Sequence, residues 1–116
     1  MSDATAGQPI GASPPARAGG VPVGLAPQTQ EFLKALGSPT RQRIMMLFAQ
    51  GAELSVGEVA ERTGISQATA SQQLTLLRRG RVVTSRRDGK TVYYRADRGG
   101  ALAALAELQS YLATCC

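Results

Sequence analysis

The chain has 116 residues, 43% of them hydrophobic, with 13 lysines and arginines, 8 acidic residues and no histidine, which gives a net charge of +5. This length fits one domain, and neither a membrane-spanning stretch of roughly 18 to 20 apolar residues nor a secretory leader is present, so we expect a cytoplasmic protein that does not bind membranes. Residues 38–98 hold eleven basic and five acidic residues, a balance that fits polyanion binding or a solvated basic surface.

The first quarter of the chain has the composition of a tail. Residues 1–27 hold five of the six prolines and few large apolar side chains. Such a segment buries too little apolar surface to repay the entropy of ordering, so we predict disorder over 1–27. The folded domain is then 28–116. A domain this small gains from burial at a subunit interface, which favours an oligomer.

Two helices begin the predicted domain. The first spans residues 28–36 and ends at Gly37, and the second begins at the capping residue Ser38 and runs to Gly51. We interpret their apolar faces as core packing, with Phe32, Leu33 and Leu36 in the first helix and Ile44, Met45, Leu47 and Phe48 in the second.

A helix-turn-helix is predicted next. Ser55 and Glu58 have the spacing of a capping box, which indicates a short third helix that ends near Gly64. Ser66 then caps a fourth helix over residues 67–79. Two helices joined by a tight glycine turn, the second polar on its leading face, form this motif, so the fourth helix is the candidate recognition helix. We expect the third and fourth helices to face the core with Val59, Ala60, Ala70, Leu74 and Leu77.

The pattern changes from helical to alternating after residue 80. Two β-prone runs, 82–87 and 90–95, flank Asp88 and Gly89, the strongest short-range signal for a β-hairpin. We therefore predict a β-wing whose inner face carries Val83, Val92 and Tyr94. Its tip carries Arg86, Arg87 and Lys90. Three cations so close together repel one another unless an anionic group offsets their charge.

A final helix is predicted over roughly residues 100–114. Its stripe of leucines, surrounded by alanines, consists of Leu102, Leu105, Leu108 and Leu112. This is more apolar surface than so small a core can use, so we expect the helix to pair with its copy in a homodimer. The predicted fold class is mainly α with a small β-hairpin, a winged helix-turn-helix with four helices, the hairpin and a terminal helix.

Double-stranded DNA is the favoured partner. Short and amide side chains at the start of the recognition helix let its backbone approach the major groove, and glutamine can form two hydrogen bonds to adenine. We expect base or phosphate contacts from Ser66, Gln67, Thr69, Ser71 and Gln72. Candidate phosphate contacts in the wing are Arg86, Arg87 and Lys90. Further candidates outside the wing are Arg41, Arg43, Arg78, Arg79 and Arg81. These five arginines can also be explained as surface charge that keeps the protein soluble.

Over about Phe32 to Thr114 the chain resembles the ArsR/SmtB-type winged-helix repressors of bacteria. The resemblance rests on four ordered stretches, Ala35–Ile44, Leu54–Ala60, Ile65–Leu74 and Arg86–Tyr94. It implies a dimer that binds an imperfect palindromic operator in the promoter of its own operon and releases it when an effector binds.

The sequence departs from the effector sites of that family. Arsenic- and cadmium-type members carry cysteines just after the leucine of the third helix, where this chain reads Leu54-Ser55-Val56-Gly57. The family's zinc, nickel or cobalt site uses histidines with carboxylates. Without histidine, Asp97 and Glu107 alone make a poor transition-metal site.

Cys115 and Cys116 remain as candidate effector ligands. Adjacent thiols can bind a soft trivalent centre such as As(III) or Sb(III), and the second protomer could add a further thiolate. Some arsenic-responsive relatives use such C-terminal pairs. The alternatives are a redox or reactive-sulfur response, an inert tail, or a DNA-binding dimer that senses nothing.

The sequence does not favour an enzyme. It offers no histidine for acid–base work, no paired carboxylates on a common face, no phosphate-binding glycine loop and no nucleophile beside a base. We therefore predict a DNA-binding repressor that requires no cofactor.

Overall fold

The computed structural model describes residues 24–116. The predicted disordered tail over 1–27 therefore lies almost wholly outside the described residues, and only its last residues enter the structure, where Pro27 begins the first helix. The elements in chain order are α1 (Pro27–Leu36), α2 (Pro39–Met46), η1 (Ala49–Gly51), β1 (Leu54–Ser55), α3 (Val56–Thr63), α4 (Gln67–Arg79), β2 (Val83–Asp88), β3 (Thr91–Ala96) and α5 (Arg98–Cys115).

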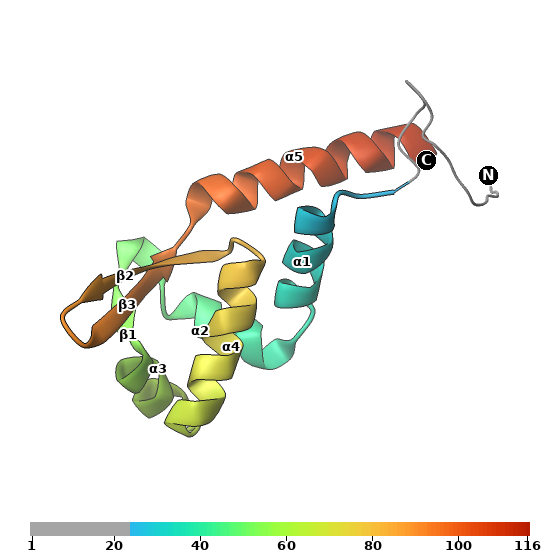
Figure 1. Ribbon diagram of the computed structural model, residues 1–116. Helices are drawn as coiled ribbons and strands as arrows, with labels where there is room; N and C mark the ends of the chain where they lie inside the picture. Colours follow the sequence, from blue (N-terminus) through green and yellow to red (C-terminus); the bar gives the residue numbers. More distant parts are fainter. Residues whose placement is uncertain (1–23) are drawn as a thin grey trace.

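The helices and the hairpin form a winged helix-turn-helix, as predicted. Figure 1 shows α5 running along one end of the molecule beside α1, while α3 and the start of α4 lie at the opposite end. The β2–β3 hairpin projects to one side (Figure 1). A membrane-spanning helix is absent from the part of the chain that the structure describes.

The sheet contains one strand more than the predicted hairpin. Its three strands are antiparallel in the order β1-β3-β2, and Leu54 and Ser55 of β1 lie opposite Tyr94 and Tyr93 of β3. A two-residue strand shows no alternation that a sequence pattern could reveal. β1 attaches the wing to the chain segment that begins α3.

The hairpin turn lies one residue later than predicted. Asp88 is paired with Thr91, so the connecting residues are Gly89 and Lys90 rather than Asp88 and Gly89. Gly89 has a φ of +64°, a left-handed conformation that glycine adopts without steric cost. Pairing therefore continues to the tip and keeps Arg86 and Arg87 in strand geometry, while Lys90 lies in the turn.

One hydrophobic core joins the helices to the inner face of the sheet. Val83 and Tyr94 are buried there and Val92 is half-buried, which confirms the predicted inner face of the wing. The buried apolar residues are Phe32, Ala35, Ile44, Phe48, Leu54, Val59, Ala60, Ala70, Leu74, Leu77, Val82, Val83, Tyr94 and Ala104.

The prediction for the end of the second helix was wrong. α2 ends at Met46 instead of continuing to Gly51. The amides of Leu47 and Phe48 bond to carbonyls only three residues back, and Gln50 then takes a positive φ of 61°. This tight turn brings Phe48 into the core.

The assignment of Leu33 to the core was also wrong. Leu33 is 43% exposed, whereas Ala35 and Thr29 are buried on the inner side of α1. The face of α1 that carries Leu33 therefore adds apolar surface to the outside of the molecule rather than to the core.

α5 packs tightly where it leaves the wing. The Asp97 carboxylate accepts a hydrogen bond from the Gly100 amide at 2.9 Å and so caps the helix. A Cβ added at Gly100 would meet the carbonyl oxygen of Arg81 and lie 2.8 Å from its Cβ. Glycine at this position allows α5 to approach the end of the recognition helix.

We predict that Gly100→Ala lowers the free energy of unfolding by about 1–3 kcal/mol, because the methyl group forces two backbone segments apart. Gly99→Ala is the matched control, since the nearest atom to its added Cβ is an Asp97 carboxylate oxygen at 3.9 Å. It should be neutral or stabilising by up to about 1 kcal/mol through helix propensity. Urea unfolding at one protein concentration measures both. Equal stability of the two variants would contradict the close approach.

Candidate nucleic-acid interface

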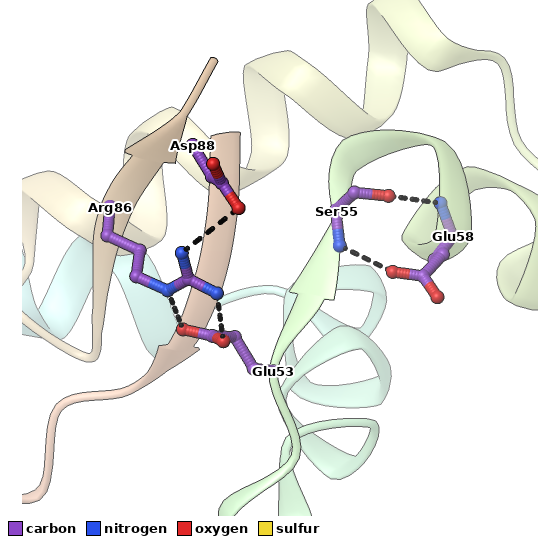
Figure 2. A network of polar contacts seen from close by, with 5 residues as sticks. All are labelled: Glu53, Ser55, Glu58, Arg86 and Asp88. Atoms are coloured by element: carbon purple, nitrogen blue, oxygen red, sulfur yellow. Dashed lines mark hydrogen bonds and ion pairs between the residues drawn. The ribbon is translucent and has the colours of Figure 1, made fainter. Parts of the chain in front are cut away.

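Both helices of the helix-turn-helix begin with side-chain caps. Ser55 Oγ accepts the Glu58 amide at 3.2 Å, and the Glu58 carboxylate accepts the Ser55 amide at 2.9 Å (Figure 2). Ser66 Oγ accepts the Thr69 amide at 3.0 Å at the start of α4. Because a cap fixes the residue at which a helix begins, these contacts set which side chains α3 and α4 present to solvent.

The predicted reading residues lie together at the start of α4. Ser66, Gln67, Ser71 and Gln72 are exposed, while Ala70, Leu74 and Leu77 hold the opposite face in the core. Thr69 is half-buried, and its hydroxyl oxygen accepts a hydrogen bond from the Ser66 hydroxyl at 3.0 Å. Four of the five side chains are therefore available to a ligand, and the fifth is partly engaged.

A shallow hollow extends this face along α4. Its volume is about 400 Å³ and its lining consists of Ser71, Gln72, Gln73, Thr75, Leu76 and Arg79. Sequence reasoning did not single out Thr75, although Ser71, Thr75 and Arg79 follow one another at the four-residue spacing that places side chains on one helix face. Arg78, a predicted phosphate contact, is exposed beside Arg79 at the C-terminal end of α4.

Arg41 is partly buried and is held by hydrogen bonds to its own domain. Its guanidinium donates to the carbonyls of Lys34 and Ala35 at 2.9 and 2.7 Å and to the side-chain oxygen of Gln73 at 2.9 Å. These bonds satisfy carbonyls at the C-terminal end of α1 and join it to α4. The structure thus gives Arg41, predicted to contact phosphate, a position between two helices.

Carboxylates offset one of the three cations at the wing tip, Arg86. Arg86 makes a forked ion pair with Glu53, with both nitrogen–oxygen distances at 2.8 Å, and its guanidinium also lies 3.9 Å from the Asp88 carboxylate (Figure 2). The same group sits 4.9 Å from the centre of the Tyr93 ring. Sequence reasoning missed Glu53, which lies thirty-three positions before its partner.

Arg87 and Lys90 differ from Arg86 in their surroundings. Both are exposed, and within residues 24–116 no carboxylate forms an ion pair with either. They are therefore the cations at the wing tip that are available to an external anion. Such side chains on a hairpin beside a recognition helix are suited to phosphate contacts.

Two glutamates of this region have lowered pKa values. The hydrogen bond with Arg86 lowers the pKa of Glu53, and the hydrogen bond from the Ser55 amide lowers the pKa of Glu58. A carboxylate whose pKa falls on folding stabilises the fold at neutral pH. That contribution is lost as the pH falls below the ordinary glutamate value of about 4.3 and through the lowered one.

The two predicted effector cysteines end the chain. Cys115 and Cys116 are exposed free thiols whose sulfur atoms lie 3.2 Å apart, and the hydrogen bond between them raises the pKa of Cys115. Among the described residues, no group of three cysteine or acidic side chains is placed to hold a metal ion. Each chain thus places two sulfur atoms side by side at this position.

Several large apolar side chains of α5 and one of α1 are exposed, and together they are called here the apolar surface of α5 and α1. Leu102, Leu105 and Leu112 are about half exposed, and Leu33 of α1 is exposed as well. Only Ala104 of α5 is fully buried, while Leu108 packs partly against the core. An 18-residue helix that buries so little of its apolar surface has the character of a subunit interface.

Comparisons with known proteins agree with this geometry. A family model described as a helix-turn-helix domain matches residues 36–86. The biofilm growth-associated repressor of Xylella fastidiosa is 40% identical over 70 residues, which is 60% of each chain. The SmtB homolog of Synechocystis, a transcriptional repressor, is 42% identical over 69 residues, 60% of this chain and 52% of that one.

A solved structure extends the match to most of the domain. It is the homodimeric winged helix-turn-helix DNA-binding domain of "a possible ArsR-family transcriptional regulator" from Mycobacterium bovis, with a TM-score of 0.59 and 34% identity. The match covers 73% of this chain and 78% of that one. Against the two curated repressors, by contrast, the chain spans little more than half of their length.

The fold, the exposed start of α4 and the cationic wing define a winged helix-turn-helix protein of the DNA-binding type. The chain belongs to the ArsR/SmtB family of transcriptional regulators, whose members are not enzymes. The family resemblance predicted from the four sequence stretches is thereby confirmed.

Proposed function

We propose that the chain is a homodimeric transcriptional repressor of its own promoter. Two α4 helices would enter successive major grooves of an imperfect palindrome, with half-sites about one helical turn apart. The observation that carries the proposal is the exposed polar start of α4 in the same domain as Arg87 and Lys90, two exposed cations that no carboxylate of residues 24–116 pairs. The helix supplies hydrogen-bonding groups for bases, and the wing supplies cations for phosphates.

A second copy of the chain is the occupant we assign to the apolar surface of α5 and α1. Leucines that are half exposed along one helix gain burial when two such helices pair, and an isologous contact buries the same patch on both protomers. The Mycobacterium bovis relative is homodimeric, which supports the same assembly here.

We further propose a thiol-based effector response, with As(III) or Sb(III) as the first choice. The 3.2 Å separation of the two sulfur atoms supports it. Each thiol would displace one hydroxyl of arsenous acid, so that an As–S bond forms, an As–OH bond breaks and one water leaves. A third sulfur would come from the other protomer, because soft metalloids prefer sulfur ligands.

Leu105→Glu should convert the dimer into a folded monomer and weaken promoter binding strongly, since it places a charge in the pairing surface and removes the second half-site contact. Met46→Glu is the control, because Met46 is 73% exposed and belongs to α2 rather than to α5 or α1. Analytical ultracentrifugation reports the assembly. A dimeric Leu105→Glu protein would rule out pairing through α5.

Ser71→Ala should reduce the preference for the promoter over unrelated DNA, and Arg87→Gln should weaken binding to all sequences alike. The wild type should lose on the order of a thousandfold in affinity between low and moderately raised salt, because several phosphate contacts release counterions. Fluorescence anisotropy with labelled duplexes measures all three. The reverse pattern for the two variants would exchange the roles of helix and wing.

Arsenite should release wild-type protein from promoter DNA under reducing conditions, and Cys115→Ser/Cys116→Ser should remain bound, because serine hydroxyls do not replace soft sulfur ligands. The same anisotropy titration measures this. If arsenite releases neither protein, the metalloid response is refuted. Release by an oxidant or a persulfide donor would then indicate thiol chemistry instead, and no release would indicate a repressor without a thiol effector.

A further inference from the structure

The guanidinium of Arg86 has three neighbours among the described residues, although its side chain remains 52% exposed. Two of its nitrogens bond to the two Glu53 carboxylate oxygens at 2.8 Å, a third lies 3.9 Å from the Asp88 carboxylate, and the Tyr93 ring covers one side at 4.9 Å. A forked pair restrains direction as well as distance. Arg86 is thus the wing-tip cation that already has carboxylate partners among the described residues.

The strand register places Arg86 and Arg87 on opposite faces of the hairpin. Arg86 lies opposite Tyr93, whereas Arg87 lies opposite Val92. Since successive residues of a strand alternate between faces, Arg87 shares the face of Val83 that packs toward the helices, and Arg86 lies on the other. The two neighbouring arginines cannot both take the same position against one DNA backbone.

Glu53 connects the wing with the start of the helix-turn-helix. It directly precedes β1, whose second residue, Ser55, forms the capping box that begins α3. Figure 2 shows both contacts along this one segment, the fork to Arg86 on one side and the cap to Glu58 on the other. A change in the angle between the wing and α3 would therefore have to break the ion pair of Glu53 with Arg86.

We propose that Glu53 is a positioning residue for DNA binding. It holds the wing at a fixed angle to α3 and α4 and keeps Arg86 from phosphate, so that Arg87 and Lys90 make the phosphate contacts of the wing tip. This inference rests on the proposed DNA-binding function and assigns a specificity role to a residue that touches no DNA.

The test is the slope of log affinity against log salt concentration, measured with promoter DNA and with an unrelated duplex of equal length. Each phosphate contact contributes about 0.9 to this slope. Glu53→Gln frees Arg86, so the slope should steepen by about one per protomer and the preference for the promoter should fall several-fold. Arg87→Gln should make the slope shallower by about one per protomer.

The double variant Glu53→Gln/Arg86→Gln separates the two effects. Without the freed arginine its slope should return to the wild-type value, while its promoter preference stays low because the fork is still broken. Circular dichroism and thermal unfolding establish that each variant is folded. A merely structural role for the ion pair would lower stability without steepening the slope.

Two results would overturn the proposal in distinguishable ways. If Arg86→Gln flattens the slope as Arg87→Gln does and Glu53→Gln leaves it unchanged, Arg86 contacts phosphate directly and Glu53 positions nothing. If the wild type shows no salt-dependent binding to either duplex, the DNA-binding function itself fails, and the role of Glu53 fails with it.

Discussion

The close packing at the end of the recognition helix is the constraint on which the remaining arrangement depends. A Cβ at Gly80 would lie 2.6 Å from the Ala35 Cβ and 2.8 Å from the Glu31 carbonyl oxygen, so α1 rests directly on the last turn of α4. Arg81 follows with a positive φ of 57°, and α5 approaches its backbone at Gly100. The two helices that carry the proposed dimer surface are therefore fixed against the helix that carries the proposed reading residues.

Polar contacts follow the same path as these close approaches. The Glu107 carboxylate of α5 accepts hydrogen bonds from the Ala26 amide and the Thr29 hydroxyl at the start of α1. The Gln28 side chain then donates to the Arg79 carbonyl at the end of α4 at 2.8 Å. A carboxylate at a helix N-terminus is favourable. In the proposed repressor, this gives a contiguous physical route from the dimer helix to α4, so effector binding at the end of α5 could alter the spacing of two recognition helices.

Local patterns predicted the fold well, and long-range contacts account for what they missed. Capping residues such as Ser66 and the glycine turn of the wing act over three or four positions, so the sequence alone indicates the helix-turn-helix and the hairpin. The fork of Glu53 with Arg86 and the bonds of Arg41 join segments far apart in the chain, which no local spacing reveals. Leu33 was misassigned because the face of α1 that turns inward is decided by packing against α4, where the small Gly80 admits it.

In the proposed repressor, the start of α4 and the tip of the wing together form the DNA-binding surface. NMR chemical-shift mapping tests this directly, with labelled protein titrated with a duplex from its own promoter. We expect the largest amide shifts over residues 66–73 and 87–91, with small ones around Met46 of α2. Large shifts confined to α2 or the outer face of α5, with residues 66–73 unperturbed, would contradict it.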